Sequence, residues 1–207
     1  MDDFDAALAT AAGFVLAGGA STRMGRNKAL LNFAGEPLAC RAARLVREAG
    51  LAVRLVGPPE LYHRLGLETI ADDRPGLGPL GAIATALAHS DRPWNLIVAV
   101  DLPHLTAGWL RALVARAAGS KADALVPRSD RGLEPLCAVY HRRCLPSILA
   151  ALDRGVRKVT GGLDGPPPCR VEEIAPAEWK GYSGDADLFE NINTPAEYRR
   201  ARPGELG

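Results

Sequence analysis

The chain has 207 residues, of which 47% are hydrophobic and 24% are charged, with a formal net charge of +1. This length suits a single globular domain with a real hydrophobic core. A net charge near zero creates no global field toward nucleic acid or membrane, so an anionic ligand must be held by local charge. The acidic N-terminus lacks the positive region of a secretory signal, and the apolar stretch 6–19 is shorter than a membrane span of about 20 residues. We therefore expect a cytoplasmic protein with no nucleic-acid or membrane partner.

Apolar runs bounded by glycine or proline alternate along the chain with segments of helical periodicity. In chain order the pattern predicts a strand over 13–17, a helix over 37–49, strands over 51–56 and 68–71, a helix over 80–89, a strand over 95–100, a helix over 107–118, strands over 122–127 and 135–140, a helix over 145–152, strands over 171–174 and 188–191, and a helix over 195–201. Thr106 and Thr194 are the expected N-caps of the third and last helices.

Strands that alternate with crossover helices indicate an α/β sandwich on a mostly parallel sheet. The run 95–100 is continuously apolar, as in a strand buried on both faces. Ligands of such sheets bind at the carboxyl ends of the strands. The loops 18–28 and 101–104 are therefore expected along one edge. We predict an N-terminal extension over 1–10 and a single domain over 11–202.

The segment 16–28 follows the first strand with Gly18 and Gly19 and then carries Arg23 and Lys28. Small residues let main-chain N–H groups approach an anion closely, and the two cations add charge. The simpler interpretation is a tight turn at the two glycines, with Arg23 and Lys28 exposed to solvent; a glycine pair alone would fit it. Gly-x-x-x-x-Gly-Lys-Ser/Thr and Gly-x-Gly-x-x-Gly are both absent, which weakens the ATPase and dehydrogenase hypotheses.

Asp101 follows the predicted central strand, and Pro103 stiffens the turn after it. A carboxylate at this position projects into the ligand crevice and suits a hard cation such as Mg²⁺. Asp101 could instead cap the next helix, but Thr106 is better placed for that. Asn191 or Asn193 could supply a second, neutral oxygen to the metal, although such asparagines are also common in turns.

Together these segments resemble the MobA-like nucleotidyltransferases, and within them the molybdenum cofactor guanylyltransferases. The resemblance is carried by Leu-Ala-Gly-Gly-x-x-x-Arg-Met-Gly-x-x-Lys at 16–28, Gly-Pro-Leu-Gly-Ala-Ile at 78–83, Asp-Leu-Pro at 101–103, Pro-Leu-Cys-Ala-Val-Tyr at 135–140 and Asn-x-Asn-Thr-Pro-x-Glu at 191–197. It spans about residues 11–200. It implies a three-layer α/β/α sandwich of the Rossmann-like nucleotidyltransferase type, also called the nucleotide-diphospho-sugar transferase type.

The resemblance also implies roles at matching positions. The expected nucleotide-binding residues are Leu16, Ala17, Gly18, Gly19, Arg23, Lys28, Asp72, Pro79, Leu80 and Asp101. Arg23, Lys28 and Asp101 would act in catalysis, and Asp101 and Asn193 would bind Mg²⁺. The family usually has Asp before the lysine, whereas this chain has Asn27, which removes a negative charge beside Lys28.

The implied reaction is Mg²⁺-dependent transfer of GMP from GTP to the terminal phosphate of molybdopterin, with release of pyrophosphate. The resemblance also implies transient contact with a molybdoenzyme or its chaperone. Transfer from CTP or ATP, or to a sugar phosphate, is the alternative within the enzyme class. A non-catalytic nucleotide-binding module is the alternative outside it.

Other polar groups remain ambiguous in the sequence. Arg142–Arg143 and Arg157–Lys158 fit solvated helix faces, or they could meet the anionic acceptor. Among the histidines, His104 stands out because it lies two residues beyond Leu102.

Overall fold

The computed structural model describes residues 3–18, 27–182, 184, 186–192, 194, 197 and 198. The strands are β1 Ala11–Leu16, β2 Asn32–Phe33, β3 Glu36–Pro37, β4 Val53–Val56, β5 Thr69–Ile70, β6 Trp94–Ala99, β7 Ala124–Ser129, β8 Gly132–Leu133, β9 Cys137–His141 and β10 Val171–Ile174. The α-helices are α1 Asp3–Ala9, α2 Leu38–Glu48, α3 Pro59–Tyr62, α4 Gly78–Ala88, α5 Ala107–Gly119, α6 Leu145–Asp153, α7 Val159–Leu163 and α8 Pro176–Trp179. Short 3₁₀ helices are η1 Lys28–Leu30, η2 His63–Leu65, η3 Arg142–Cys144 and η4 Lys180–Tyr182.

The main sheet has the strand order β10-β7-β9-β6-β1-β4-β5, and β8 pairs with β7. β1 lies between β4 and β6 and is parallel to both, and β5 continues the parallel run beyond β4. β9 is antiparallel to its neighbours β6 and β7. The prediction of a mostly parallel sheet is confirmed. Because β6, β1, β4 and β5 run the same way, their carboxyl ends meet at one edge.

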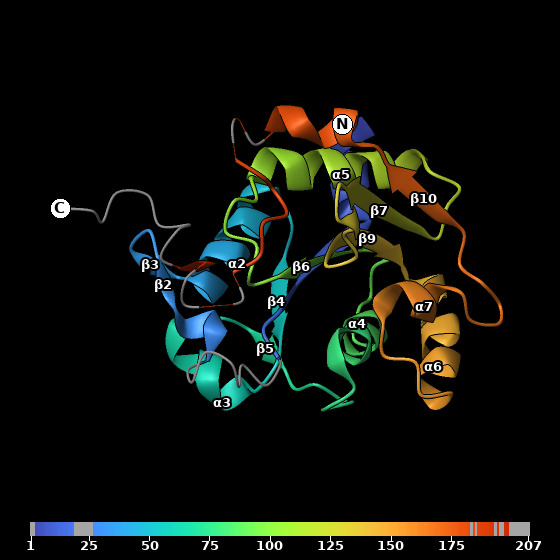
Figure 1. Cartoon of the computed structure of the whole chain (residues 1–207), viewed down its shortest axis with the longest axis horizontal. Coiled ribbons are helices and arrows are strands. Elements are labelled where there is room, and N and C mark those ends of the chain that lie inside the picture. Colours follow the sequence, from blue (N-terminus) through green and yellow to red (C-terminus); the bar gives the residue numbers. More distant parts are fainter. Residues whose placement is uncertain are drawn as a thin grey trace.

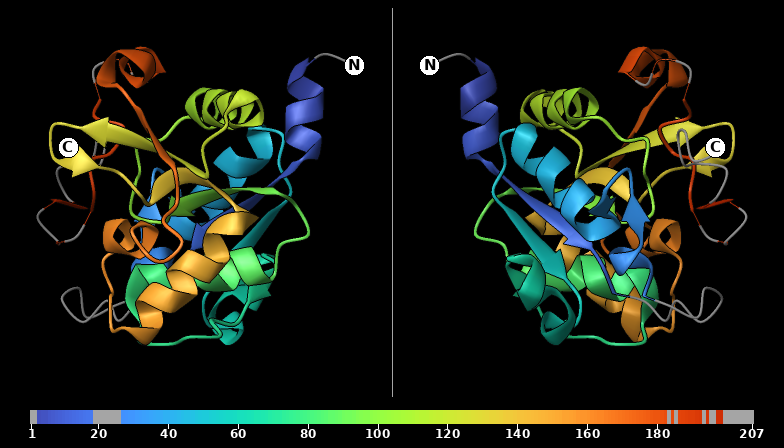
Figure 2. Two further views of the ribbon diagram at one scale, coloured as in Figure 1. Left: turned by 90° about the vertical axis from the view of Figure 1, so that its right-hand side faces the viewer. Right: turned by 90° about the vertical axis from the view of Figure 1, so that its left-hand side faces the viewer.

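Helices cover both faces of this sheet and bury it (Figure 1). Every residue of β1 and β6 is buried, as expected for strands enclosed on both sides. One hydrophobic core joins the sheet to α2 and α5, and a second joins it to α4, α6 and α7. Figure 2 shows α5 above the sheet and α4 and α6 below it. The three-layer α/β/α sandwich is therefore confirmed.

Most predicted elements agree with the structure to within about two residues. The α5 helix begins after Thr106, whose hydroxyl accepts a hydrogen bond from the Trp109 N–H at 3.2 Å, as its capping role predicted. The hairpin β2–β3 was not predicted, because its strands are too short to show a periodic pattern.

The predicted strand over 188–191 is wrong. Leu188 and Phe189 lie in a turn, and Asn191 has no regular structure. Both apolar side chains are fully buried, and the Phe189 ring packs edge-on against Trp179 with centroids 4.8 Å apart. These two apolar side chains therefore anchor a loop to the core. A short apolar run looks the same in the sequence whether it belongs to such a loop or to a strand.

Both ends of the described chain are tied to the fold. Helix α1 covers residues of the predicted N-terminal extension and packs against α5. Near the other end, the Glu197 N–H donates to the Thr194 hydroxyl at 3.2 Å, and the Thr194 N–H donates to the Glu197 carboxylate at 3.0 Å. This reciprocal pair is a capping box and supports the predicted N-cap. Most of the predicted helix 195–201 lies outside the described residues. Within those residues, no helix has the length and apolar character needed to cross a membrane.

Candidate functional site

The carboxyl edge of the parallel strands gathers the segments that the sequence singled out. Gly18 follows β1, Gly57 follows β4, Asp72 follows β5 and Asp101 follows β6. The chain leaves β1 toward β4 and β5 and then returns on the other side of β1 as β6. This reversal creates a topological switch point at the carboxyl ends of β1 and β6, and α/β sheets bind ligands at such points.

Lys28 and Asp101 meet at this edge, although they are far apart in sequence. The Lys28 Nζ lies 3.0 Å from Asp101 Oδ2, and the two side chains are 15% and 19% exposed. The other carboxylate oxygen, Oδ1, is buried and has no hydrogen-bond partner among the described residues. Buried carboxylate oxygens are normally satisfied, so one without a hydrogen-bond partner is a candidate position for a ligand atom.

The turn that carries Asp101 is held from several directions. The Ile192 N–H donates to the Asp101 carbonyl at 3.0 Å, and Arg41 Nε donates to the Pro103 carbonyl at 2.9 Å. His104 Nε2 lies 3.3 Å from a carboxylate oxygen of Glu190. These contacts come from α2 and from the segment 186–192. They fix the backbone around Asp101 without occupying its free oxygen.

The bond from Ile192 brings the predicted asparagine segment beside Asp101. Ile192 is fully buried, whereas the preceding Asn191 is exposed. Asn193, predicted as a second metal ligand, lies outside the described residues. The asparagine segment is therefore linked to the Asp101 turn through Ile192, which lies between Asn191 and Asn193 in the chain.

The glycine-rich segment is described only at its two ends, because Gly19 and Arg23 lie outside the described residues. Ala17 is buried and Gly18 is exposed at the end of β1. At the other end, Asn27 caps η1 by accepting the Ala29 N–H at 3.0 Å. This cap places Lys28 at the start of η1, with its ammonium group directed to Asp101.

Sequence reasoning missed Tyr62, the last residue of α3. Its fully buried hydroxyl donates to the Ala17 carbonyl at 2.6 Å and accepts from Asn27 Nδ2 at 3.1 Å. Burial raises the pKa of this phenol. A lone tyrosine in a short helix carries no motif, so no sequence signal could have identified it.

The remaining predicted nucleotide contacts differ in accessibility. Asp72 is half-buried and accepts from the Arg74 N–H at 2.9 Å and the Thr85 hydroxyl at 3.1 Å. Pro79 is exposed in the first turn of α4. Leu80 is fully buried, and its side chain packs against Gly162. Leu16 is also buried, at 6% exposed, so both leucines could reach a ligand only through the backbone.

A divalent cation fits the donor set at this edge. Within the described ranges, no group of three His, Cys, Asp or Glu side chains could hold a metal on its own. The open Oδ1 of Asp101 can supply one hard oxygen. Mg²⁺ usually binds through one or two carboxylates and takes its remaining ligands from phosphates and water. The residues present therefore suit a cation that arrives with a nucleotide.

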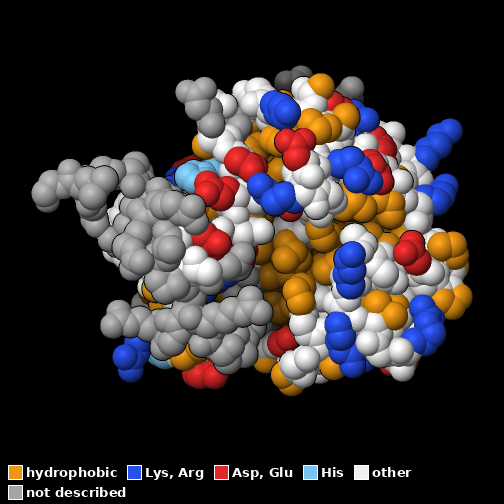
Figure 3. All heavy atoms as spheres, in the orientation of Figure 1, with side chains coloured by type: hydrophobic (Ala, Val, Ile, Leu, Met, Phe, Trp, Pro, Cys, Tyr) orange, Lys and Arg blue, Asp and Glu red, His pale blue; other side chains and the backbone are white. Residues whose placement is uncertain are grey.

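Two of the four basic residues left open by the sequence have side-chain partners within the protein. Arg143 pairs with Asp123, and Arg157 Nη1 donates to the Leu152 and Val156 carbonyls at 3.2 and 3.0 Å. Lys and Arg side chains on the face shown in Figure 3 are interspersed with acidic ones. These interactions explain the two arginines as structural groups.

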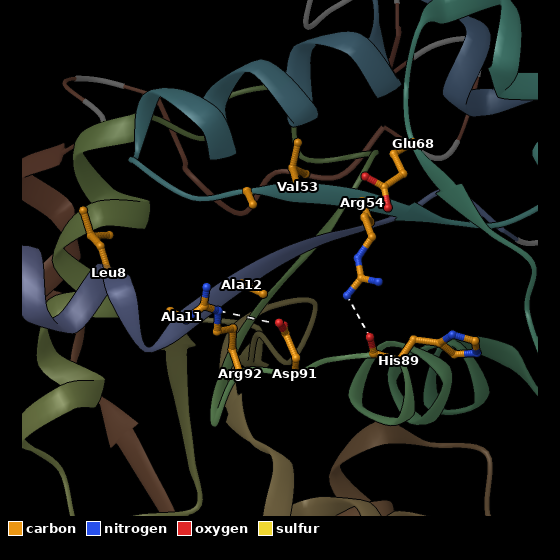
Figure 4. A pocket seen from close by; sticks show the side chains of 10 residues that line it. Leu8, Ala11, Ala12, Val53, Arg54, Glu68, His89, Asp91 and Arg92 are labelled. Atoms are coloured by element: carbon orange, nitrogen blue, oxygen red, sulfur yellow. Dashed lines mark hydrogen bonds and ion pairs between the residues drawn. The ribbon is translucent and has the colours of Figure 1, made fainter.

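A cavity of about 490 Å³ lies at the opposite edge of the sheet, lined by the starts of β1 and β4. There Arg54 Nη2 donates to the His89 carbonyl at 2.8 Å, and Arg92 lies 3.9 Å from Asp91 (Figure 4). Because these strands are parallel to β6, this edge is remote from Asp101. The cavity therefore lies away from the site assembled around Lys28.

Comparisons with known proteins consistently indicate one family. A family model described as the MobA-like NTP transferase domain matches residues 13–166. A Deinococcus radiodurans relative named "Probable molybdenum cofactor guanylyltransferase" is 38% identical over 191 residues, covering 88% of this chain and 89% of the relative. A Pelotomaculum thermopropionicum relative with the same name is 34% identical, with 93% and 92% covered. The crystal structure of molybdopterin-guanine dinucleotide biosynthesis protein A from Archaeoglobus fulgidus superimposes with a TM-score of 0.79 at 25% identity, covering 92% of this chain and 96% of that one.

Proposed function

We propose that this chain, which belongs to the MobA-like NTP transferase family, transfers GMP from GTP to the terminal phosphate of molybdopterin and releases pyrophosphate. The observation that carries the proposal is the Lys28–Asp101 pair, whose free Oδ1 lies at the switch point of the sheet. The names of relatives that match about nine-tenths of the chain support guanylyl transfer and the molybdopterin acceptor.

The reaction exchanges one phosphoanhydride bond for another. An oxygen of the acceptor phosphate forms a bond to the α-phosphorus of GTP, while the bond from that phosphorus to the bridging oxygen of the β-phosphate breaks. The electron pair of the broken bond leaves with pyrophosphate. A phosphate monoester is already ionised near neutral pH, so the protein needs no strong general base.

Positioning and charge neutralisation supply most of the rate in such transfers. The Lys28 ammonium group is held at the site by Asp101 and would neutralise charge on the triphosphate. Arg23 is expected to add a second cation. The backbones of Leu16, Ala17, Gly18 and Gly19, with Asp72 and the Pro79–Leu80 turn, would hold the base, ribose and phosphates.

Asp101 would hold Mg²⁺ through its free oxygen, with Asn193 or Asn191 nearby. When bound, Mg²⁺ would polarise the α-phosphate and neutralise charge on the leaving group. A contact with the molybdoenzyme or its chaperone would follow, because the product must be passed on.

The test is pyrophosphate release by the full chain with Mg²⁺, molybdopterin and each of GTP, CTP and ATP. We expect release with GTP. Release with CTP or ATP alone would keep the transfer mechanism and overturn the choice of base. Tight nucleotide binding without release, even when sugar phosphates are offered, would favour a binding module.

Two matched variants locate the reaction. Asp101→Asn should lower release by about 100- to 1,000-fold. Asp91→Asn should leave it unchanged, because Asp91 is 83% exposed at the opposite edge of the sheet. Equal activity in the two variants would remove Asp101 from the proposed site.

A further inference from the structure

Tyr62 joins the two described ends of the glycine-rich segment. Its hydroxyl donates to the carbonyl of Ala17, at the end of β1, with an O···O distance of 2.6 Å. The same oxygen accepts from Asn27 Nδ2, just before Lys28, at 3.1 Å. Residues 17 and 27 are therefore linked through one buried side chain that is remote from both in sequence.

The hydrogen-bond directions follow from the atoms available. Asn27 Oδ1 accepts the Ala29 backbone N–H at 3.0 Å, so the amide nitrogen must face the tyrosine. The phenol has a single proton, and Ala17 O is much nearer to it than Asn27 Oδ1, which lies at 3.5 Å. The tyrosine therefore donates to Ala17 and accepts from Asn27.

Gly57 allows this close approach. A Cβ at Gly57 would lie 3.1 Å from the Gly18 nitrogen and 3.2 Å from both the Ala17 carbonyl carbon and Tyr62 Cε2. Those distances are shorter than ordinary Cβ contacts, so a side chain here would push the tyrosine ring or the peptide aside. Because the peptide between Ala17 and Gly18 is planar, fixing its carbonyl also fixes the direction of the Gly18 N–H.

We propose that Tyr62 is a positioning residue for nucleotide binding, which holds the Ala17–Gly18 peptide and the Asn27–Lys28 backbone in register with each other. The inference rests on the proposed function, because it assumes that these two segments bind the triphosphate. It also explains why position 27 carries an asparagine. Because the tyrosine hydroxyl donates its proton to Ala17, its bond with residue 27 requires a donor there, and a carboxylate offers none.

The experiment measures the dissociation constant of Mg²⁺·GTP by titration calorimetry, with CTP and ATP as alternative probes, for the full chain and four variants. Tyr62→Phe keeps the ring against Gly57 and removes the hydroxyl. We expect about tenfold weaker nucleotide binding, the order expected for one buried hydrogen-bonding group. Tyr140→Phe is the matched control, because Tyr140 is also fully buried and its hydroxyl donates to a backbone carbonyl, that of Pro135, at 2.7 Å.

Thermal unfolding separates positioning from stability. Both tyrosine variants should lower the melting temperature by similar amounts, but only Tyr62→Phe should weaken nucleotide binding. If both variants weaken binding equally, the effect is a general loss of stability and the inference is wrong.

Asn27→Asp tests the same bond from the other side. The carboxylate can still accept from Ala29, but it competes with Ala17 for the tyrosine proton. We expect Asn27→Asp to weaken nucleotide binding several-fold in the wild-type background and to have no further effect in the Tyr62→Phe background. Additive effects would contradict a shared hydrogen bond. If Tyr62→Phe does not fold, unchanged binding in Asn27→Asp alone overturns the inference.

The wild-type titration separates the two proposals. A chain that binds none of the three triphosphates overturns the proposed function, and this inference with it. A chain that binds one of them, while Tyr62→Phe and Asn27→Asp bind it equally well, overturns only the role of Tyr62.

Discussion

Two carboxylates at opposite edges of the sheet differ in how completely they are satisfied. Asp123 precedes β7, is 8% exposed and accepts the Arg170 N–H at 2.7 Å on Oδ2. The Arg170 guanidinium adds a bond to Oδ2 at 3.3 Å, and Arg143 pairs with Oδ1. Asp101 follows β6 and has Lys28 on one oxygen, while its other oxygen is buried with no hydrogen-bond partner among the described residues.

The difference distinguishes a carboxylate that stabilises the fold from one that is available to a ligand. Burial alone would raise the pKa of Asp123, but the bonds from Arg170 and Arg143 outweigh it and lower the pKa to about 2. Both carboxylate oxygens of Asp123 are directed to the protein itself. Asp101 keeps one acceptor oxygen without a hydrogen bond to the described residues. A buried acceptor without a partner lowers stability, and such a group is retained where a ligand supplies the missing interaction.

The largest expected effect is on activity at Asp101. Asp101→Asn keeps the shape of the side chain but removes its charge, so we expect pyrophosphate release to fall by about 100- to 1,000-fold, as when one strong electrostatic contact to a transition state is lost. The free energy of unfolding should fall by less than for the corresponding change at Asp123, because one oxygen of Asp101 has no hydrogen bond to the described residues. Parallel measurements of release and of urea unfolding check both. A large loss of stability would assign Asp101 to the structural class of Asp123.

The reverse pattern is expected at Asp123. Asp123→Asn should lower the free energy of unfolding by about 1–2 kcal/mol, a value reduced from that of a fully buried pair because Arg143 and Arg170 are 45% and 67% exposed. Pyrophosphate release per folded molecule should not change. Loss of activity in the folded variant would show that the two edges are coupled.

Acid should act on the same carboxylate. The folded pKa of Asp123 is about 2, below its ordinary value of 3.8, so its contribution is complete above the higher value and is lost as the pH falls toward 2. The wild-type free energy of unfolding should therefore decrease below about pH 4 more steeply than that of Asp123→Asn. Unfolding curves at closely spaced pH values between about 5 and 2 measure the difference, and parallel curves would contradict it.

The contrast between these carboxylates also shows what the sequence could predict. Asp101 was predicted because it follows a long apolar strand and shares a turn with Pro103. A residue that follows a parallel strand lies at the carboxyl edge of the sheet, where ligands bind. Lys28 was found from a motif. Neither pattern revealed that the two side chains would pair, because their contact depends on the tertiary fold, which brings η1 to the turn after β6.

Supporting residues were harder to predict for the same reason. Tyr62, Arg41 and Glu190 act through contacts with residues that are distant in the sequence, and such contacts leave no periodic or local signal. The apolar run at 188–191 was misinterpreted as a strand, since burial in a loop and burial in a sheet give the same short pattern. Regular elements were predictable because their periodicity is local, whereas the contacts that position the site are not.

Arg41 should have a smaller effect than Asp101. Arg41→Gln removes the bond to the Pro103 carbonyl and the cation that lies 5.5 Å from the centre of the Phe33 ring. We expect pyrophosphate release to fall about fivefold, since the loss of one hydrogen bond, worth about 1 kcal/mol, loosens the Asp101 turn. Arg47→Gln on the same helix is the control, because Arg47 is exposed in its last turn. Equal rates in the two variants would show that the turn holds Asp101 without Arg41.

The smallest expected effect is at the contact between His104 and Glu190. Their nearest atoms are 3.3 Å apart, and the Glu190 side chain is 47% exposed, so water competes with this contact. Glu190→Gln should lower pyrophosphate release by about twofold, because an exposed contact of this kind contributes less than about 1 kcal/mol. The Ile192 bond to the Asp101 carbonyl remains in this variant, so the turn keeps its main support. A tenfold loss would instead mean that Glu190 contacts a substrate directly, and the ligand edge would then contain a second carboxylate that is available to a ligand, as Asp101 is.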